Sequence, residues 1–202
     1  GNTFANDGLY VYNSYQNSVV NNTVNGRLLV YLEGVSNYTV DDAGQVILVR
    51  CGNIKVEGLN LSRSTVGVEL WETSNSTISN NNITNNKWYG IMLYYSFNNS
   101  ISNNNITATY YRGICLIGSS KNSIAGNNIA NNWLGISLSS SSNNRVFHNN
   151  LITNTNQLYS SNSMNIWDDG YPSGGNYWSD YTGVDANGDG IGDTPYVIDE
   201  NN

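Results

Sequence analysis

The sequence is poor in residues that several classes of protein need. Its 202 residues include two prolines, two methionines, two cysteines and one histidine, and helix formers such as alanine, glutamate and lysine are scarce. We therefore expect few or no helices. The longest apolar runs, Leu28–Leu32 and Val46–Val49, are far shorter than the roughly 18 residues that a membrane span requires. The sequence predicts no membrane span in this chain.

Positive charge is also scarce. Eight Lys and Arg residues are scattered among fifteen Asp and Glu residues, which gives a formal net charge of -7 and a pI near 4.4. Such a chain repels a phosphate backbone, so we expect no nucleic-acid partner. Nothing in the composition marks a division into two independent globular domains, and one elongated domain is the expectation.

Asparagine is abundant instead, with 38 residues that follow an internal repeat. Five similar blocks succeed one another at spacings of 22, 23, 23 and 22 residues, and they begin at Val56, Ile78, Ile101, Ile124 and Val146. Each of the first four blocks continues to a glycine followed by alternating apolar residues, as in Gly90-Ile91-Met92-Leu93. This alternation has a period of two, which is typical of a half-buried strand.

The repeat predicts an all-β fold, a right-handed parallel β-helix of about seven coils over residues 1–156. Leucine-rich repeats have a similar period, but here the inward positions are mostly Ile and Val, and no segment has a helical apolar stripe. The same phase in Leu9, Val11, Val19 and Val24 places the N-terminal residues within coils. The chain would then begin in mid-coil, as a fragment of a longer protein, unless these residues form an irregular cap.

Residues one coil apart should stack at about 4.8 Å, so repeated asparagines should form ladders. Two such columns are expected, one with Asn22, Asn81, Asn104, Asn127 and Asn149, and one with Asn60, Asn82, Asn105, Asn128 and Asn150. Glycosylation sequons begin at Asn21, Asn37, Asn60, Asn75, Asn82, Asn98 and Asn105. The ladder would make Asn60, Asn82 and Asn105 poor glycan acceptors.

The repeat stops near Leu158, and residues 157–202 are rich in aromatic and turn residues, which suits a C-terminal cap over the open end of the solenoid. This segment contains a candidate Ca²⁺ loop with oxygen ligands at calcium-loop spacing. Its ligands would be the side chains of Asp185, Asn187, Asp189 and Asp193 and the carbonyl of Ile191. The pattern lacks the terminal bidentate Glu, since Tyr196 stands there, and an ordinary Asp-Gly turn is the alternative.

The Asn-rich repeats, the run Gly174–Tyr181 (Gly-Gly-Asn-Tyr-Trp-Ser-Asp-Tyr) and the run Gly188–Pro195 together resemble the NosD-like β-helix proteins of bacteria and archaea. The resemblance covers nearly the whole chain. It implies a pectate-lyase-type helix, a link to carbohydrates and a location outside the cytoplasm. The link of NosD to a copper enzyme is not carried over, because one His, two Met and two Cys are few ligands for copper.

Catalysis by paired carboxylates needs Asp or Glu on neighbouring coils, yet there is none between Thr73 and Trp167. The carboxylates that remain near the first coils are Asp41, Asp42, Glu57, Glu69 and Glu72, and we expect them to form a solvated charged patch. If the chain is an enzyme, the catalytic residues would be Asp41, Asp42, Glu69 and Glu72. The single histidine, His148, aligns with corner asparagines and needs no further role.

Aromatic residues recur two positions before the repeat glycine, at Trp88, Tyr111 and Trp133. This column would stack against sugar rings or a neighbouring molecule, or upon itself.

Cys51 and Cys115 lie three coils apart, about 14 Å, which is too far for a disulfide, and we expect surface or corner thiols.

These patterns predict a secreted or cell-surface protein, in a periplasm or on an archaeal exterior. The expected function is that of a non-enzymatic β-helix module, structural or fibre-forming, that contacts glycans or neighbouring subunits. The alternative is a carbohydrate-active enzyme, a polysaccharide lyase or glycosidase, with its site on the first coils.

Overall fold

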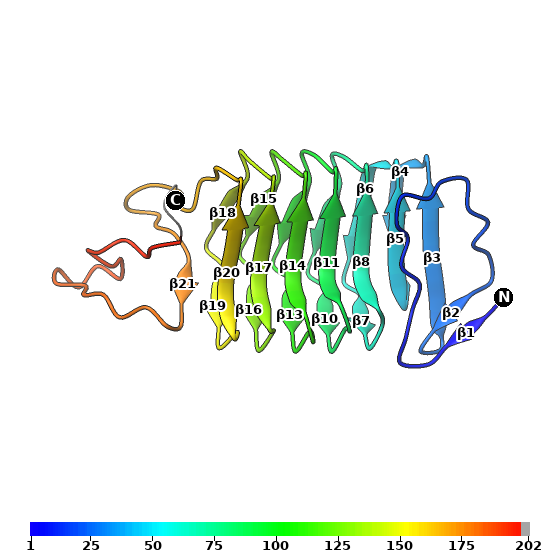
Figure 1. The fold of residues 1–202 in the computed structure, drawn as a ribbon, viewed down its shortest axis with the longest axis horizontal. Coiled ribbons are helices and arrows are strands. Elements are labelled where there is room, and N and C mark those ends of the chain that lie inside the picture. The colour runs from blue at the N-terminus through cyan, green and yellow to red at the C-terminus, as the bar shows by residue number, and fades with distance from the viewer. Residues whose placement is uncertain (199–202) are drawn as a thin grey trace.

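The computed structural model describes residues 1–198, and their regular secondary structure consists of strands. The strands stack along the long axis of the molecule in three parallel-stranded faces (Figure 1). The chain is a right-handed parallel β-helix of about seven turns, as its repeat predicts. Residues 1–198 contain no helix, and so none that is long and apolar enough to cross a bilayer.

The longest strands form a nine-stranded sheet. In spatial order they are β1 (Thr3–Phe4), β2 (Thr23–Val24), β3 (Arg27–Glu33), β5 (Gln45–Val49), β8 (Val66–Trp71), β11 (Tyr89–Tyr94), β14 (Arg112–Ile117), β17 (Leu134–Ser139) and β20 (Asn156–Ser161). The seven strands from β3 to β20 pair in parallel, whereas β2 pairs with β3 antiparallel.

Two six-stranded sheets complete each coil. One contains β4 (Ser36–Val40), β6 (Gly52–Glu57), β9 (Thr77–Ser79), β12 (Ser100–Ser102), β15 (Ser123–Ala125) and β18 (Arg145–Phe147). The other contains β7 (Asn60–Ser62), β10 (Asn82–Thr84), β13 (Asn105–Thr107), β16 (Asn128–Ala130), β19 (Asn150–Ile152) and β21 (Tyr177–Trp178). Ile78, Ile101 and Ile124 are in register on successive coils, so residues 22 or 23 apart are vertical neighbours.

The core fills the inside of the solenoid with columns of aliphatic side chains. Ile91, Leu93 and Ile101 are fully buried, and so are their equivalents on the coils above and below. The repeat glycine allows this close stacking, because a Cβ built on Gly113 would lie 2.7 Å from the carbonyl oxygen of Gly135. The regular coil therefore depends on both the aliphatic columns and the glycine column.

The predicted asparagine ladders are present. In the buried ladder, the Asn104 side chain accepts from the backbone N–H of Asn81 at 3.0 Å, donates to the Ile78 carbonyl at 2.9 Å and donates to Asn127 Oδ1 at 3.0 Å. An exposed ladder joins Asn82, Asn105 and Asn128 through amide contacts of 2.7–2.8 Å. Two further buried ladders lie at other corners, with Asn99, Asn122 and Asn144 in one and Asn132 and Asn154 in the other.

The N-terminal residues depart from the prediction. Residues 5–22, which we call the strap, contain no strand and lie outside the coils, across the outer face of the nine-stranded sheet. Leu9 and Val11 do not fill a coil interior but pack against a second core on the outer face that includes Ile47 and Val49. The expectation was wrong because these outward positions of the first coils are themselves apolar and require a cover.

The C-terminal segment packs over the last coil. The β21 strand pairs with β19 and buries Trp178, whose ring stacks on Tyr196 with centroids 4.1 Å apart. Trp167 and Tyr181 pack against the same end of the core. Apolar side chains of the last coil are thus shielded from water, in the way that a solenoid end requires.

Candidate functional site

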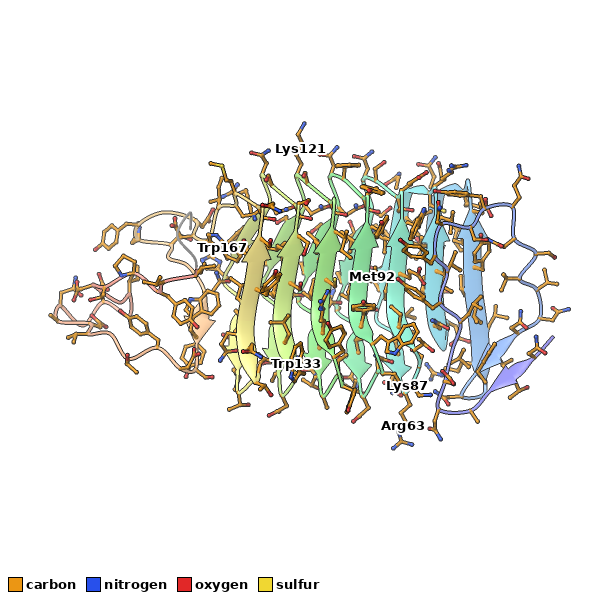
Figure 2. The ribbon with its side chains drawn as sticks, in the orientation of Figure 1. Arg63, Lys87, Met92, Lys121, Trp133 and Trp167 are labelled. Atoms are coloured by element: carbon orange, nitrogen blue, oxygen red, sulfur yellow. The ribbon has the colours of Figure 1, made fainter. Side chains whose placement is uncertain are left out.

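The outer face of the nine-stranded sheet contains a column of outward side chains that are buried. The middle outward position of each strand is in register with the next, and this central column contains Ile47, Glu69, Met92, Cys115, Ser137 and Tyr159. Outward side chains of a sheet are normally solvated, yet Glu69, Met92, Cys115 and Ser137 are all at most 1% exposed. Figure 2 shows Met92 near the middle of this face.

The strap covers one half of the column. Its backbone is held by sheet side chains rather than by a strand ladder: Leu9 N–H donates to Gln45 Oε1 at 2.9 Å, and Gln45 Nε2 donates to the Leu9 carbonyl at 2.6 Å. Tyr15 Oη accepts from Trp71 Nε1 at 2.8 Å. The Tyr12 ring packs edge-on against Trp71 at 5.5 Å. The strap therefore lies along β8, between β5 and β11.

Glu69 is the carboxylate beneath the strap. Its Oε2 accepts the Val11 N–H at 3.2 Å, whereas its Oε1 is buried and has no hydrogen-bond partner. Burial raises the pKa of this carboxyl to about 8, and the Val11 hydrogen bond only partly opposes the effect. The prediction that Glu69 belongs to a solvated charged patch is wrong, because the non-repeating strap covers it.

The other predicted carboxylates do not join Glu69 in a catalytic pair. Glu72 accepts from Arg50 Nε at 2.8 Å and from Tyr15 Oη at 2.7 Å. Asp42 lies 3.8 Å from Arg27, and both Asp41 and Asp42 are exposed at the corner before β5. The structure therefore does not bring these four residues together at one site.

The other half of the face carries an arginine and aromatic rings. Arg112 Nη1 donates to Cys115 Sγ at 3.3 Å, and its guanidinium carbon lies 4.5 Å from the centroid of the Tyr111 ring. Its Nε is buried without a hydrogen-bond partner, and no carboxylate pairs with this cation among residues 1–198. Burial raises the pKa of the Cys115 thiol, and Arg112 opposes this shift.

The aromatic column is only partly as predicted. Tyr111 and Trp133 stack with centroids 5.1 Å apart, and Trp133 is 46% exposed near the beginning of β17 (Figure 2). Trp88 instead packs against Tyr10 of the strap, at 5.3 Å and nearly perpendicular. Sequence reasoning missed Arg112, although it is a charge that stands immediately before a repeat glycine.

Both cysteines are free and buried, so the prediction of surface thiols is wrong, although Cys51 does lie at a corner, between β5 and β6. The Cys51 thiol lies 3.4 Å from the Leu32 carbonyl and 3.3 Å from the Val49 carbonyl. Cys115 projects outward on β14 but is covered by the neighbouring Arg112 side chain. Neighbouring side chains, which the repeat pattern does not describe, decide the burial of these thiols.

The candidate calcium loop brings its predicted residues together, but their oxygens mostly accept from the loop backbone. Asp185 accepts the N–H groups of Gly188 at 2.7 Å and Gly190 at 2.9 Å, and Asp193 accepts the Ala186 N–H at 2.6 Å. Within residues 1–198, no three His, Cys, Asp or Glu side chains are arranged to hold a metal ion. Calcium binding by Asp185, Asn187, Asp189, Ile191 and Asp193 stays a prediction.

His148 fastens the C-terminal segment to the last coils. Its Nε2 lies 2.9 Å from the Ser173 carbonyl oxygen and 3.2 Å from Ser173 Oγ, which in turn donates to Asp169. Asp169 forms an ion pair with Arg145. A cavity of about 1010 Å³ lies nearby, between the last coil and residues 165–198, and Trp167 and Trp178 are among its lining residues.

Comparison with solved structures supports the fold. A point mutant of the periplasmic alginate epimerase AlgG aligns with a TM-score of 0.51 and 22% identity, over 74% of this chain and 33% of that chain. The A-module of the mannuronan C-5 epimerase AlgE4 from Azotobacter vinelandii aligns with a TM-score of 0.28 and 12% identity, over 68% of this chain and 53% of that one. The chain thus spans about a third of the AlgG structure.

No curated protein matches the sequence. A family model does, however, and it covers most of the chain. It is described as periplasmic copper-binding protein (NosD), and it matches residues 1–183. The chain therefore belongs to the NosD family.

Proposed function

We propose that this chain is a glycan-binding β-helix module that works outside the cytoplasm and has no catalytic role of its own. The observation that carries the proposal is the stacked pair Tyr111 and Trp133, with Trp133 46% exposed, beside the Arg112 guanidinium. An aromatic face packs against the apolar face of a sugar ring, and a neighbouring cation fixes a polar substituent. We call Tyr111, Arg112 and Trp133 the open segment of the sheet face.

The charge distribution favours an acidic sugar. The chain has a net charge of -7, but no Asp or Glu occurs between Thr73 and Trp167, so the acidic residues lie near the two ends. The open segment is therefore free of competing carboxylates on its own coils. Arg112 has no carboxylate partner within residues 1–198, and guanidinium groups bind carboxylates through paired hydrogen bonds. A uronate carboxylate supplies the missing partner.

The names of similar proteins also support a glycan ligand and a location outside the cytoplasm. The family is described as periplasmic, and the AlgG relative is named as a periplasmic alginate epimerase. Alginate is a polymer of uronic acids, which agrees with the requirement of Arg112. Because the likeness to AlgG extends only to the fold, the glycan preference of this chain rests on its own residues.

An enzymatic function has one favourable observation, the raised pKa of Glu69, which suits a group that exchanges protons near neutral pH. Against it, none of the other carboxylates within residues 1–198 lies beside Glu69, and the strap covers it. The assay for this second candidate measures reducing ends and unsaturated products from a polysaccharide panel. Turnover that is lost in Glu69→Gln and retained in Asp42→Asn would replace our proposal with an enzyme.

Copper does not enter the proposal, because the available donors do not fit it. The single histidine binds Ser173, and the Cys115 thiol lies against the Arg112 cation. Cys51 is buried against backbone carbonyls on a different coil. Copper sites need several soft or imidazole donors that converge on one point.

The test is calorimetric titration of the protein with an alginate-derived oligouronate and with a neutral glucan oligomer. We expect binding of the oligouronate, a loss of about tenfold or more for Trp133→Ala, and a similar loss for Arg112→Gln. The matched controls are Tyr38→Ala, an exposed aromatic residue on β4, and Lys121→Gln, an exposed cation at another corner. Equal affinity of all four variants would refute the open segment as the site.

The same aromatic pair would also suit contact with a neighbouring subunit in a fibre. Light scattering over a range of protein concentrations separates these two uses of the surface. Our proposal expects a monomer whose mass does not grow with concentration, and assembly that Trp133→Ala abolishes would favour the structural role instead.

A further inference from the structure

The strap fills the part of the sheet face that is continuous with the open segment. It runs along the outward side of β8 and contacts β5 and β11, while the open segment lies at the beginnings of β14 and β17. The central column runs through both parts in one register, from Ile47 to Tyr159. The Tyr10 and Trp88 rings mark the boundary between them. The face is thus one surface, half open and half covered.

The residues beneath the strap have the chemistry of a binding site for a hydroxyl-rich chain. Gln45 and Glu69 are 0% and 1% exposed, and Trp71 is 2% exposed, although all three belong to the outer face. They present an amide, a carboxyl and an indole N–H, and each bonds to the strap. Amides, carboxyls and aromatic rings are the groups that hydrogen bond to sugar hydroxyls and pack on sugar rings.

The hydrogen bonding of Glu69 indicates that the strap does not satisfy all the polar groups that it covers. The strap offers one N–H to this carboxyl, and Oε1 stays buried without a partner. The titratable groups that face it are Tyr10 from the strap and Tyr89 from β11, and neither is a cation. A buried carboxyl oxygen without a hydrogen-bond partner lowers the stability of the closed arrangement, and a hydroxyl-rich ligand, which both donates and accepts, would satisfy both oxygens.

We infer that Gln45, Glu69 and Trp71 form a second, covered segment of the glycan site, and that a long polyuronate displaces strap residues 8–15 to reach it. This inference rests on the proposed function, because the open segment must bind the chain first. The strap then lowers the apparent affinity for long chains, since only the fraction of molecules with a displaced strap offers the whole face.

The first experiment is hydrogen exchange on the wild-type protein with and without saturating alginate-derived oligouronates of graded length. We expect slower exchange in peptides over residues 111–137 with every oligomer that binds. We expect faster exchange in peptides over residues 8–15 with the long oligomers. Protection at 111–137 with unchanged exchange at 8–15 would overturn this inference and leave the proposed function intact. No change in either region would reject both.

The second experiment loosens the strap without substituting any residue of the covered segment. Asp7→Asn removes the 3.0 Å ion pair with Lys87, and Tyr15→Phe removes the hydrogen bonds to Glu72 and Trp71. In the double variant, affinity for long oligouronates should rise on the order of threefold or more, with no change for short ones. The control is the double variant Asp42→Asn with Tyr38→Phe, on surfaces away from the strap. Unchanged affinity for long oligomers in the loosened variant would contradict the inference.

Discussion

Glu69 Oε2 accepts the backbone N–H of Val11 at 3.2 Å, and this contact joins the outer face of the solenoid to the strap. It also holds a carboxyl that pairs with no cation in the described part of the chain. The protonated form is favoured there, so the closed strap and the proton on Glu69 are linked. The free energy of unfolding should therefore decrease as pH rises and Glu69 loses its proton.

The pKa of Glu69 rises from an ordinary value of 4.5 to about 8 in the folded chain. As pH rises, Glu69 loses its proton near pH 4.5 in the unfolded chain but only near pH 8 in the folded chain. The free energy of unfolding should therefore fall between about pH 4.5 and about pH 8 and then level off. Glu69→Gln should flatten this slope and be more stable than the wild type at pH 8, by about 1–3 kcal/mol. Urea unfolding at several pH values measures it, with the exposed Glu57→Gln as control. A slope that persists in Glu69→Gln would assign it to another group.

Asparagines 104 and 105 are sequence neighbours in two different ladders. The buried Asn104 side chain hydrogen bonds to two backbone groups and to the Asn127 side chain. The Asn105 side chain is exposed, and its hydrogen bonds are to the side-chain amides of its ladder neighbours. We expect Asn104→Ala to cost about 2–4 kcal/mol of unfolding free energy and Asn105→Ala less than about 1 kcal/mol. Urea denaturation compares them directly. Equal costs would show that burial does not govern the ladder contribution.

Gly113 is expected to be intolerant of a side chain. A Cβ there would lie 2.7 Å from the Gly135 carbonyl oxygen and 3.1 Å from Asn132 Nδ2, so adjacent coils would have to separate. Gly113→Ala should lower stability by about 1–3 kcal/mol. Gly52→Ala is the matched control, because its nearest neighbour would be Ser36 Oγ at 3.5 Å. Thermal unfolding checks both, and a harmless Gly113→Ala would mean that the coils separate at little cost.

The calcium loop makes a separate prediction about the C-terminal segment. If Asp185, Asp189 and Asp193 turn their oxygens to Ca²⁺, the thermal midpoint should rise with added calcium and fall with a chelator. Asp185→Asn should reduce that response. Magnesium at the same concentration is the control, because it demands a tighter octahedral site. A midpoint that ignores calcium and chelator alike would leave the loop as an Asp-Gly turn.

The Cys115 thiol should be slow to react with a thiol reagent in the native protein. Burial raises its pKa and denies access, and both effects disappear on unfolding. Absorbance of the released thiolate of a disulfide reagent, with and without urea, measures the rates. Cys115→Ser separates its contribution from that of Cys51. Rapid native labelling at Cys115 would indicate that the Arg112 side chain opens readily.

Much of the solenoid could be predicted because the same residue pattern recurs every 22 or 23 residues. The spacing between Ile78, Ile101 and Ile124 gives the register, and the asparagine columns give the ladders. The aromatic positions Tyr111 and Trp133 follow from the same spacing. Residues at one position of a repeat have the same neighbours on every coil, so a pattern in the sequence becomes a column in space.

The sequence by itself determined the β-helix, its register and the columns along its faces, because these depend on contacts one coil apart. Only the tertiary structure decided which outward side chains are covered. The strap meets Gln45 and Glu69 across separations of 36 and 58 residues, and no period links these positions. Burial of Glu69 follows from that single non-repeating contact, and so does the division of the sheet face into an open and a covered half.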